Sequence, residues 1–196
     1  MIRIVLVLCL ITSVWAKLNV KDLYHKSYNY EKMRDYDDAI KVLKPLYRKY
    51  PRGYTLNLRL AWLFYLSGRY ANAIDHYKRA SLVLPSSLEP KLGLAMVYLA
   101  MRNYKAAKET ATSIVRTDYY NYYGNIYLVR SLLALKEYKS AAKVAKKMLA
   151  IYPTDVKFLT FLARAYKSID PARSKRIYMD VLILDPNNPE AKEALE

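Results

Sequence analysis

The sequence has very little cysteine, histidine and glycine. Cys9 is its single cysteine among 196 residues, and it has two histidines, His25 and His76, and four glycines. One thiol cannot form an intrachain disulfide, and two isolated histidines without thiols nearby offer no zinc ligand set. None of the glycines belongs to a glycine-rich loop of the kind that binds phosphate. We therefore expect a protein that is not an enzyme, with no catalytic residues, no metal and no cofactors.

Long apolar runs are also lacking, except at the start of the chain. Residues 4–16 are apolar apart from Thr12 and Ser13, Arg3 precedes them, and the small Ala16 ends the run. This pattern is typical of a secretory signal peptide cut after residue 16. A membrane span is the weaker alternative, because thirteen residues reach roughly 20 Å across a hydrocarbon core of about 30 Å. We expect residues 17–196 to be exported, to the periplasm or as a secreted protein.

Acidic residues are few compared with basic ones. The chain has 33 lysines and arginines against 17 acids, a net charge of +16, and removal of Arg3 with the signal peptide leaves 32 against 17, or +15. Nucleic acid would match this charge, but export makes it an unexpected partner. We expect the surplus of lysines and arginines, which is concentrated in the predicted second helix of each repeat described below, to form a solvated outer face. Attraction to an anionic envelope surface is the alternative.

Tyrosine is abundant, and four of the 21 tyrosines follow a period of 34 residues. Each has an alanine three positions later; the pairs are Tyr36 and Ala39, Tyr70 and Ala73, Tyr104 and Ala107, and Tyr138 and Ala141. A period of this length predicts repeated helix–turn–helix units that bury their apolar sides against one another.

The period places the units at about residues 20–53, 54–87, 88–121, 122–155 and 156–188. The second unit is the most complete, with Leu60, Ala61, Phe64, Gly68, Tyr70, Ala73, Tyr77, Ala80 and Pro85. The fifth is one residue short, and we expect the gap in its turn near Pro171. Proline closes three of the first four units because it cannot continue a helix. The third unit has Tyr119 instead, and we expect residues 119–123 either to wedge into the next interface or to form an exposed edge.

This pattern resembles the tetratricopeptide repeat family from about residue 20 to residue 186. The resemblance implies an all-α fold, a right-handed α-solenoid of about five repeats, as one domain over residues 17–196 with a C-terminal capping segment. It also implies a concave groove, lined by the first helix of each unit, that binds a protein or peptide partner. The family's clamp for terminal carboxylates is not implied, because its positions here hold Tyr24, Tyr28, Arg59, Glu89 and Gly93.

Recurring positions in each unit share the helical face that the resemblance turns toward the groove. The predicted groove residues are Tyr24, Tyr28, Arg59, Trp62, Tyr65, Met96, Tyr127, Arg130 and Arg164. Trp62 and Tyr65 form the expected contact anchor, although Trp62 could instead pack against a neighbouring helix. Arg130 and Arg164 either select acidic groups or are solvated.

Three functions remain open from the sequence. The first is an exported, non-catalytic interaction scaffold that holds a partner segment in its groove. The second is a module for envelope polysaccharide or another anionic surface, in which the groove aromatics stack on sugar rings and lysines meet anionic groups. The third is an accessory subunit of a larger envelope machine.

Overall fold

The computed structural model describes residues 19–196, so the predicted signal peptide lies outside the described residues. Within this range the chain contains helices and no strands. The helices are α1 (Val20–Lys32), α2 (Tyr36–Lys41), α3 (Lys44–Lys49), α4 (Tyr54–Leu66), α5 (Tyr70–Val83), α6 (Glu89–Ala100), α7 (Tyr104–Thr117), α8 (Tyr122–Ala134), α9 (Tyr138–Leu149), α10 (Val156–Lys167), α11 (Pro171–Leu184) and α12 (Pro189–Leu195).

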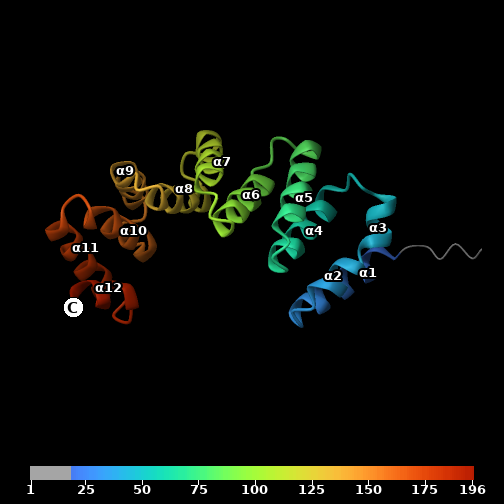
Figure 1. Ribbon diagram of the computed structural model, residues 1–196, viewed down its shortest axis with the longest axis horizontal. Coiled ribbons are helices and arrows are strands. Elements are labelled where there is room, and N and C mark those ends of the chain that lie inside the picture. Colours follow the sequence, from blue (N-terminus) through green and yellow to red (C-terminus); the bar gives the residue numbers. More distant parts are fainter. Residues whose placement is uncertain (1–18) are drawn as a thin grey trace, which may run out of the picture.

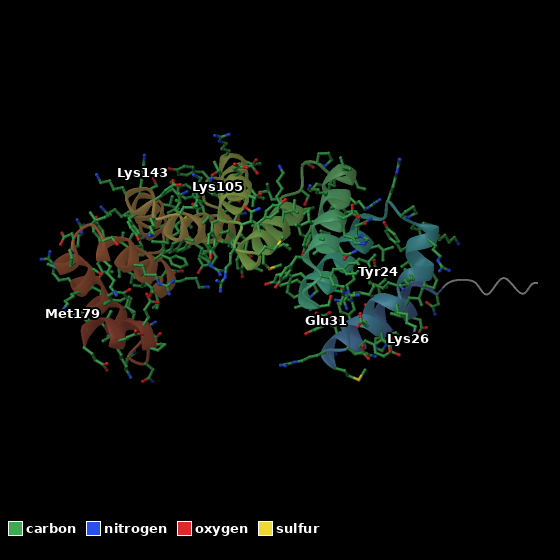
Figure 2. All side chains as sticks on the ribbon, in the orientation of Figure 1. Tyr24, Lys26, Glu31, Lys105, Lys143 and Met179 are labelled. Carbon is green, nitrogen blue, oxygen red and sulfur yellow. The ribbon has the colours of Figure 1, made fainter. Side chains whose placement is uncertain are left out.

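From α4 onward each helix packs against the next one in the chain, and α2 packs between α1 and α4. The first helices α4, α6, α8 and α10 also contact one another in sequence. In Figure 1 the chain forms an arch, with α1 and α12 at its two ends on the same side. The second helices α7 and α9 carry Lys105 and Lys143 on the outer side of this arch (Figure 2). The expected all-α solenoid is confirmed.

The second helix of the first unit is divided into α2 and α3. Pro45 stands in the first turn of α3 and has no N–H to donate to the carbonyl of Lys41 four residues earlier. The backbone tightens at this point, where the N–H of Leu43 bonds to the carbonyl of Ile40. Proline is tolerated at the start of a helix, so the chain begins a new short helix here instead of continuing α2.

The first four turns between paired helices share a left-handed residue at the same repeat position. Arg34, Gly68, Arg102 and Lys136 have φ values of 61°, 74°, 58° and 61°. In each turn the next residue's N–H reaches back to a carbonyl five positions earlier, as from Arg69 to Phe64 at 2.8 Å. This is the Schellman closure of a helix.

The fifth unit is one residue short, but the residue is missing from its first helix and not from the turn, where we expected the gap. The turn before α11 still has three residues, and α10 ends one residue earlier than the period requires. No left-handed residue occurs in that turn; instead Ile169 and Asp170 both donate their N–H groups to the carbonyl of Tyr166. Asp170 then caps α11 by accepting from the N–H of Arg173 at 3.0 Å.

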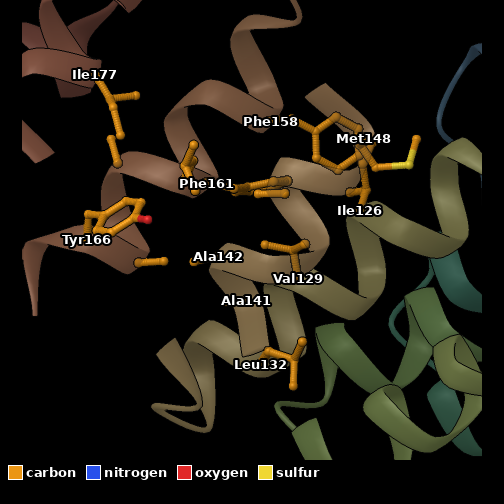
Figure 3. Close-up of a cluster of buried hydrophobic side chains, with 14 of the residues drawn as sticks. Ile126, Val129, Leu132, Ala141, Ala142, Met148, Phe158, Phe161, Tyr166 and Ile177 are labelled. Carbon is orange, nitrogen blue, oxygen red and sulfur yellow. The ribbon is translucent and has the colours of Figure 1, made fainter. Parts of the chain in front are cut away.

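Small residues let the paired helices approach closely. The four periodic alanines are fully buried, as are Ala61, Ala95 and Ala163. Gly93 goes further, because a Cβ there would lie 2.3 Å from the ring of Tyr77. The largest cluster joins the third to fifth units with α12, and Figure 3 shows Met148 of α9 and Phe158 of α10 beside Ile126 of α8.

Residues 119–123 mostly form an exposed edge, and the wedge interpretation holds for Tyr122 alone. Tyr119, Tyr120 and Tyr123 are each about half exposed. Tyr122 packs against Phe158, with ring centroids 5.5 Å apart, and its hydroxyl donates to Asp155 at 2.8 Å.

Candidate partner-binding groove

An open hollow of about 720 Å³ lies where the first helices of units one to three meet. Its aromatic lining comes from Tyr24 and Tyr28 of α1 and from Tyr54 and Trp62 of α4. The Tyr54 hydroxyl lies 2.8 Å from the Ser87 Oγ and donates to Glu89 at 3.2 Å, and burial raises the pKa of Tyr54. The four rings and Leu58 give the hollow an apolar wall, and its charged lining consists of two acids, Glu31 and Glu89, and two bases, Lys32 and Arg59.

Glu31 organises the polar side of this hollow. It accepts from the Trp62 indole Nε1 at 2.7 Å and forms an ion pair with Arg59. Arg59 is only 6% exposed; it also donates to the Ser27 Oγ and stacks over the Tyr28 ring at 3.8 Å. Its charge is therefore already compensated within the chain, and its contribution to the groove is to fix Tyr28 and Trp62 in place.

A second hollow of about 270 Å³ continues from the first, sharing Leu58, Trp62 and Glu89 with it. Its other walls are Tyr77, Leu92, Gly93, Met96 and Tyr127. This volume suits one or two apolar side chains. Its floor depends on Gly93, because a side chain at that position would displace the Tyr77 ring.

The structure places Trp62 against side chains of its own helix and of α1, and also in the wall of the two hollows. It is half-buried and packs on Tyr65, with ring centroids 5.6 Å apart and a 29° angle between the planes, yet it also lines both hollows. Tyr65 lines neither hollow in this structure and contacts the Tyr70 ring at 6.0 Å. We therefore interpret Tyr65 as the support behind Trp62.

Arg130 and Arg164 meet at a third hollow of about 350 Å³, between α6, α7, α8 and α10. Arg164 forms a two-pronged ion pair with Glu190 of α12, which also accepts from the Tyr178 hydroxyl at 2.8 Å. Arg130 is exposed and takes part in none of the ion pairs found among residues 19–196. Of the two arginines, Arg130 is the one available to an acidic ligand.

The structure brings Tyr24, Tyr28, Arg59, Trp62, Met96 and Tyr127 together in two joined hollows and places Arg130 and Arg164 in a third. Sequence reasoning missed Tyr54 and named Glu89 only as a position of the absent clamp; both residues line the hollow from the first turns of α4 and α6. The signal was available, since Glu89 follows the start of a unit by one residue. The role of Glu31 as a shared acceptor could not be predicted from the sequence, because it depends on how α1 packs on α4.

Residues 19–196 contain neither a cluster of metal ligands nor a helix that could span a membrane. No group of three or more histidine, cysteine, aspartate or glutamate side chains lies close enough to hold a metal ion. None of the helices in this part of the chain has the length and apolar content needed to cross a membrane.

A tetratricopeptide repeat family model matches residues 26–81 and 92–156, and a second one matches residues 64–119. The chain belongs to the tetratricopeptide repeat family. This membership accounts for the 34-residue period and for the stacked helix pairs.

Solved tetratricopeptide repeat structures have the same fold at low sequence identity. A protein from Parabacteroides merdae is 19% identical, with a TM-score of 0.81 over 89% of this chain and 70% of its own. MamA is 15% identical, with a TM-score of 0.74 over 87% of this chain and 93% of its own. YrrB, described as having an unusual peptide-binding site, is 10% identical, with a TM-score of 0.73 over 88% and 89%. No curated protein sequence matches the chain.

Proposed function

We propose that this protein is a non-catalytic interaction scaffold that holds an extended segment of a partner protein in its concave groove. The observation that carries the proposal is the pair of joined hollows, which run across the first helices of successive units. Peptide binding by YrrB, a protein of the same fold, supports this class of function. Export of the protein, to the periplasm or beyond, is part of the proposal and rests on the signal-peptide pattern at residues 1–16.

The groove contacts define the chemistry of the partner segment. An apolar or aromatic side chain enters the hollow between Trp62 and Met96, and an acidic side chain meets Arg130. Trp62 and Arg130 occupy the same position two units apart. Adjacent first helices lie about 10 Å apart, so Trp62 and Arg130 are separated by roughly 20 Å along the groove. An extended chain covers this distance with about six residues. The partner should therefore carry an acidic residue about six positions from its apolar anchor.

Affinity capture with the double variant Trp62→Ala, Arg130→Glu tests the groove. The expected result is a protein captured by the unchanged chain and lost with the variant, because truncating a central tryptophan and reversing a charge removes both anchors; the loss is on the order of a hundredfold in affinity. A cross-linking amino acid in place of Met96 should become attached to the partner. Circular dichroism confirms that the variant retains its helices.

The matched control is Lys143→Glu, which makes the same charge change on the exposed outer side of α9. Equal capture by the unchanged chain and the groove variant would contradict the proposal. Binding to purified envelope polysaccharide that depends on the groove tyrosines and resists salt would instead support the polysaccharide function.

A further inference from the structure

The exposed apolar side chains gather at one edge of the solenoid. Because the helices of each unit run in opposite directions, the junctions between units lie at one edge and the turns within units at the other. Seventeen large apolar or aromatic side chains are exposed among residues 19–196, and nine of them lie at the first four junctions. These nine are Tyr50, Leu82, Val83, Leu84, Tyr119, Tyr120, Tyr123, Ile151 and Tyr152. The turns within units expose three, Met33, Met101 and Ile169.

We call residues 48–52, 79–84, 116–123 and 146–157 the junction edge. Eight bases and two acids lie in these ranges. One acid, Asp155, accepts from the Tyr122 hydroxyl and from the N–H of Phe158. The other, Asp118, accepts from the Asn121 side chain at 3.0 Å. The junction edge therefore combines apolar side chains with a strong positive charge, whereas residues 180–187 at the last junction carry Asp180, Asp185 and no base.

Two places on the junction edge show how these side chains are arranged. Pro51, Arg52, Arg79, Leu82 and Val83 line a hollow of about 480 Å³, in which arginines border an apolar wall. Arg79 pairs with Asp75, so Arg52 is the more available of the two. Further along, the Lys147 ammonium lies 4.0 Å from the Tyr119 ring and donates to the Tyr119 carbonyl at 2.8 Å. Burial lowers the pKa of Lys147.

We propose that the junction edge docks this protein on an anionic lipid bilayer. Its leucine, valine and tyrosine side chains enter the headgroup region, while its arginines and lysines meet lipid phosphates. The tyrosines do not form a platform for successive sugar rings, because Tyr119 and Tyr120 stand at 81° to each other and Tyr122 and Tyr152 at 87°. None of the residues that line the groove hollows belongs to this edge, so a docked protein keeps its groove open to a partner.

A site-specific experiment tests the docking on the full chain. Residues 4–16 are apolar enough to bind lipid themselves, so bulk binding is uninformative and the contact must be read at single positions. In a Cys9→Ser background, an environment-sensitive fluorophore is attached to Leu82→Cys or Tyr120→Cys on the junction edge. Met33→Cys and Met101→Cys are the matched positions at the opposite edge. The probe is vesicles of phosphatidylglycerol and phosphatidylcholine in equal parts, compared with phosphatidylcholine alone.

Fluorophores at positions 82 and 120 should brighten about threefold and shift to the blue with anionic vesicles, and those at 33 and 101 should not. High salt should reduce the response, because it shortens the screening length from about 10 Å at 0.1 M to about 3 Å at 1 M. Equal responses at both edges, no response, or the same response to neutral vesicles would overturn the proposal. A fluorescence response without lipid would also overturn the proposal. Such a response would indicate binding to a second copy if it rises with protein concentration, and binding to polysaccharide if it follows addition of wall polysaccharide.

Charge reversal gives an independent readout. Lys49→Glu with Arg52→Glu should lower affinity for the anionic vesicles by about thirtyfold or more, measured by vesicle titration of the fluorescence at position 120. Lys105→Glu with Lys143→Glu makes the same charge change on the outer side of the arch and should have a clearly smaller effect. An equal loss of affinity in both variants would show that net charge alone attracts the protein, and it would overturn the proposal that the junction edge docks on lipid. The Trp62→Ala, Arg130→Glu variant should retain the lipid response, which separates this proposal from the groove.

Discussion

Two buried asparagines at the same repeat position illustrate how single residues depend on their neighbours. Asn57 donates to the carbonyls of Pro51 and Gly53, and Asn125 donates to those of Tyr119 and Asn121, so each fixes the junction before its helix. The Oδ1 of Asn57 lies 2.8 Å from the Nδ1 of His76. The Oδ1 of Asn125 is buried without a partner. The reason lies in the sequence, since Val144 occupies the position equivalent to His76 in that unit.

His76 makes the stability of the protein depend on pH. Its ring is buried between Tyr47 and Phe64, with centroids 5.1 and 5.3 Å away, and burial lowers its pKa. The nearby charges, Asp75 and Arg79, act in opposite directions. As pH falls through about 6.5, His76 becomes protonated in the unfolded chain but stays neutral in the folded chain. The free energy of unfolding should therefore decrease below pH 6.5, by at most about 1.4 kcal/mol per pH unit.

Urea unfolding at several pH values from 7.5 to 5 would measure this effect. His76→Val is the matched variant, because it copies the arrangement around Val144. The variant should be less stable than the unchanged chain at pH 7.5, and the difference between the two should shrink as pH falls. A difference that stays constant with pH would show that His76 is not the responsible group.

At the same scale, the pattern placed the predicted groove side chains on one helical face and could not identify their internal partners. Arg59 and Arg164 both look available in the sequence, yet Glu31 and Glu190 neutralise them. These carboxylates lie 28 and 26 residues away along the chain. Such pairs depend on how closely neighbouring first helices approach, and a sequence period does not contain that distance.

At the scale of helices and turns, the left-handed residue in each of the first four turns is a source of strain wherever it is not glycine. A left-handed conformation costs roughly 1–2 kcal/mol for a residue with a Cβ. Gly68 avoids this cost, and Arg34, Arg102 and Lys136 bear it. A Cβ at Gly68 would meet nothing within 4 Å, so a substitution there measures the backbone alone.

Gly68→Ala should lower the free energy of unfolding by about 1 kcal/mol, and Arg102→Gly should raise it by about 0.5 kcal/mol. The gain is smaller than the loss because glycine also increases the conformational freedom of the unfolded chain. Chemical unfolding of both variants tests the pair. Arg102→Lys, with the same charge and a Cβ, is the control and should leave stability unchanged. Changes of the same sign in both variants would show that the turn conformation is not the cause.

The regular spacing predicts where the first helix of each unit begins. The first helices begin at Val20, Tyr54, Glu89, Tyr122 and Val156, at or within one residue of the expected unit starts. The break between α2 and α3 could have been predicted from Pro45, which has no N–H with which to continue α2. The shortened α10 could not, because either the helix or the turn could lose a residue, and packing of α10 on α11 decided between them.

At the scale of the whole molecule, α12 packs against the helices of the fifth unit. Ala191 is fully buried, and Ala194 and Leu195 join the cluster that contains Tyr178 and Val181. Glu190 adds its bonds to Arg164 and Tyr178. Because each unit of a solenoid contacts only its neighbours, α12 stabilises the unit on which it packs first.

Deletion of residues 189–196 should therefore accelerate amide hydrogen exchange in α10 and α11 by about tenfold or more and leave α4 and α5 nearly unchanged. Hydrogen exchange with mass spectrometry resolves the units. Glu190→Gln keeps the helix and loses only the charged pair, so its effect on α10 should be smaller. Equal acceleration in all units would show that the array unfolds as one cooperative body instead.

The sequence by itself determined the repeat length, the helical fold and the family. It could do so because a 34-residue period and buried alanines report on local helix geometry, which repeats in every unit. Only the tertiary structure decided which groove arginine is free, how the hollows join, and that the apolar side chains collect at the junction edge. These features depend on distances between units, which are fixed by packing and not by spacing along the chain.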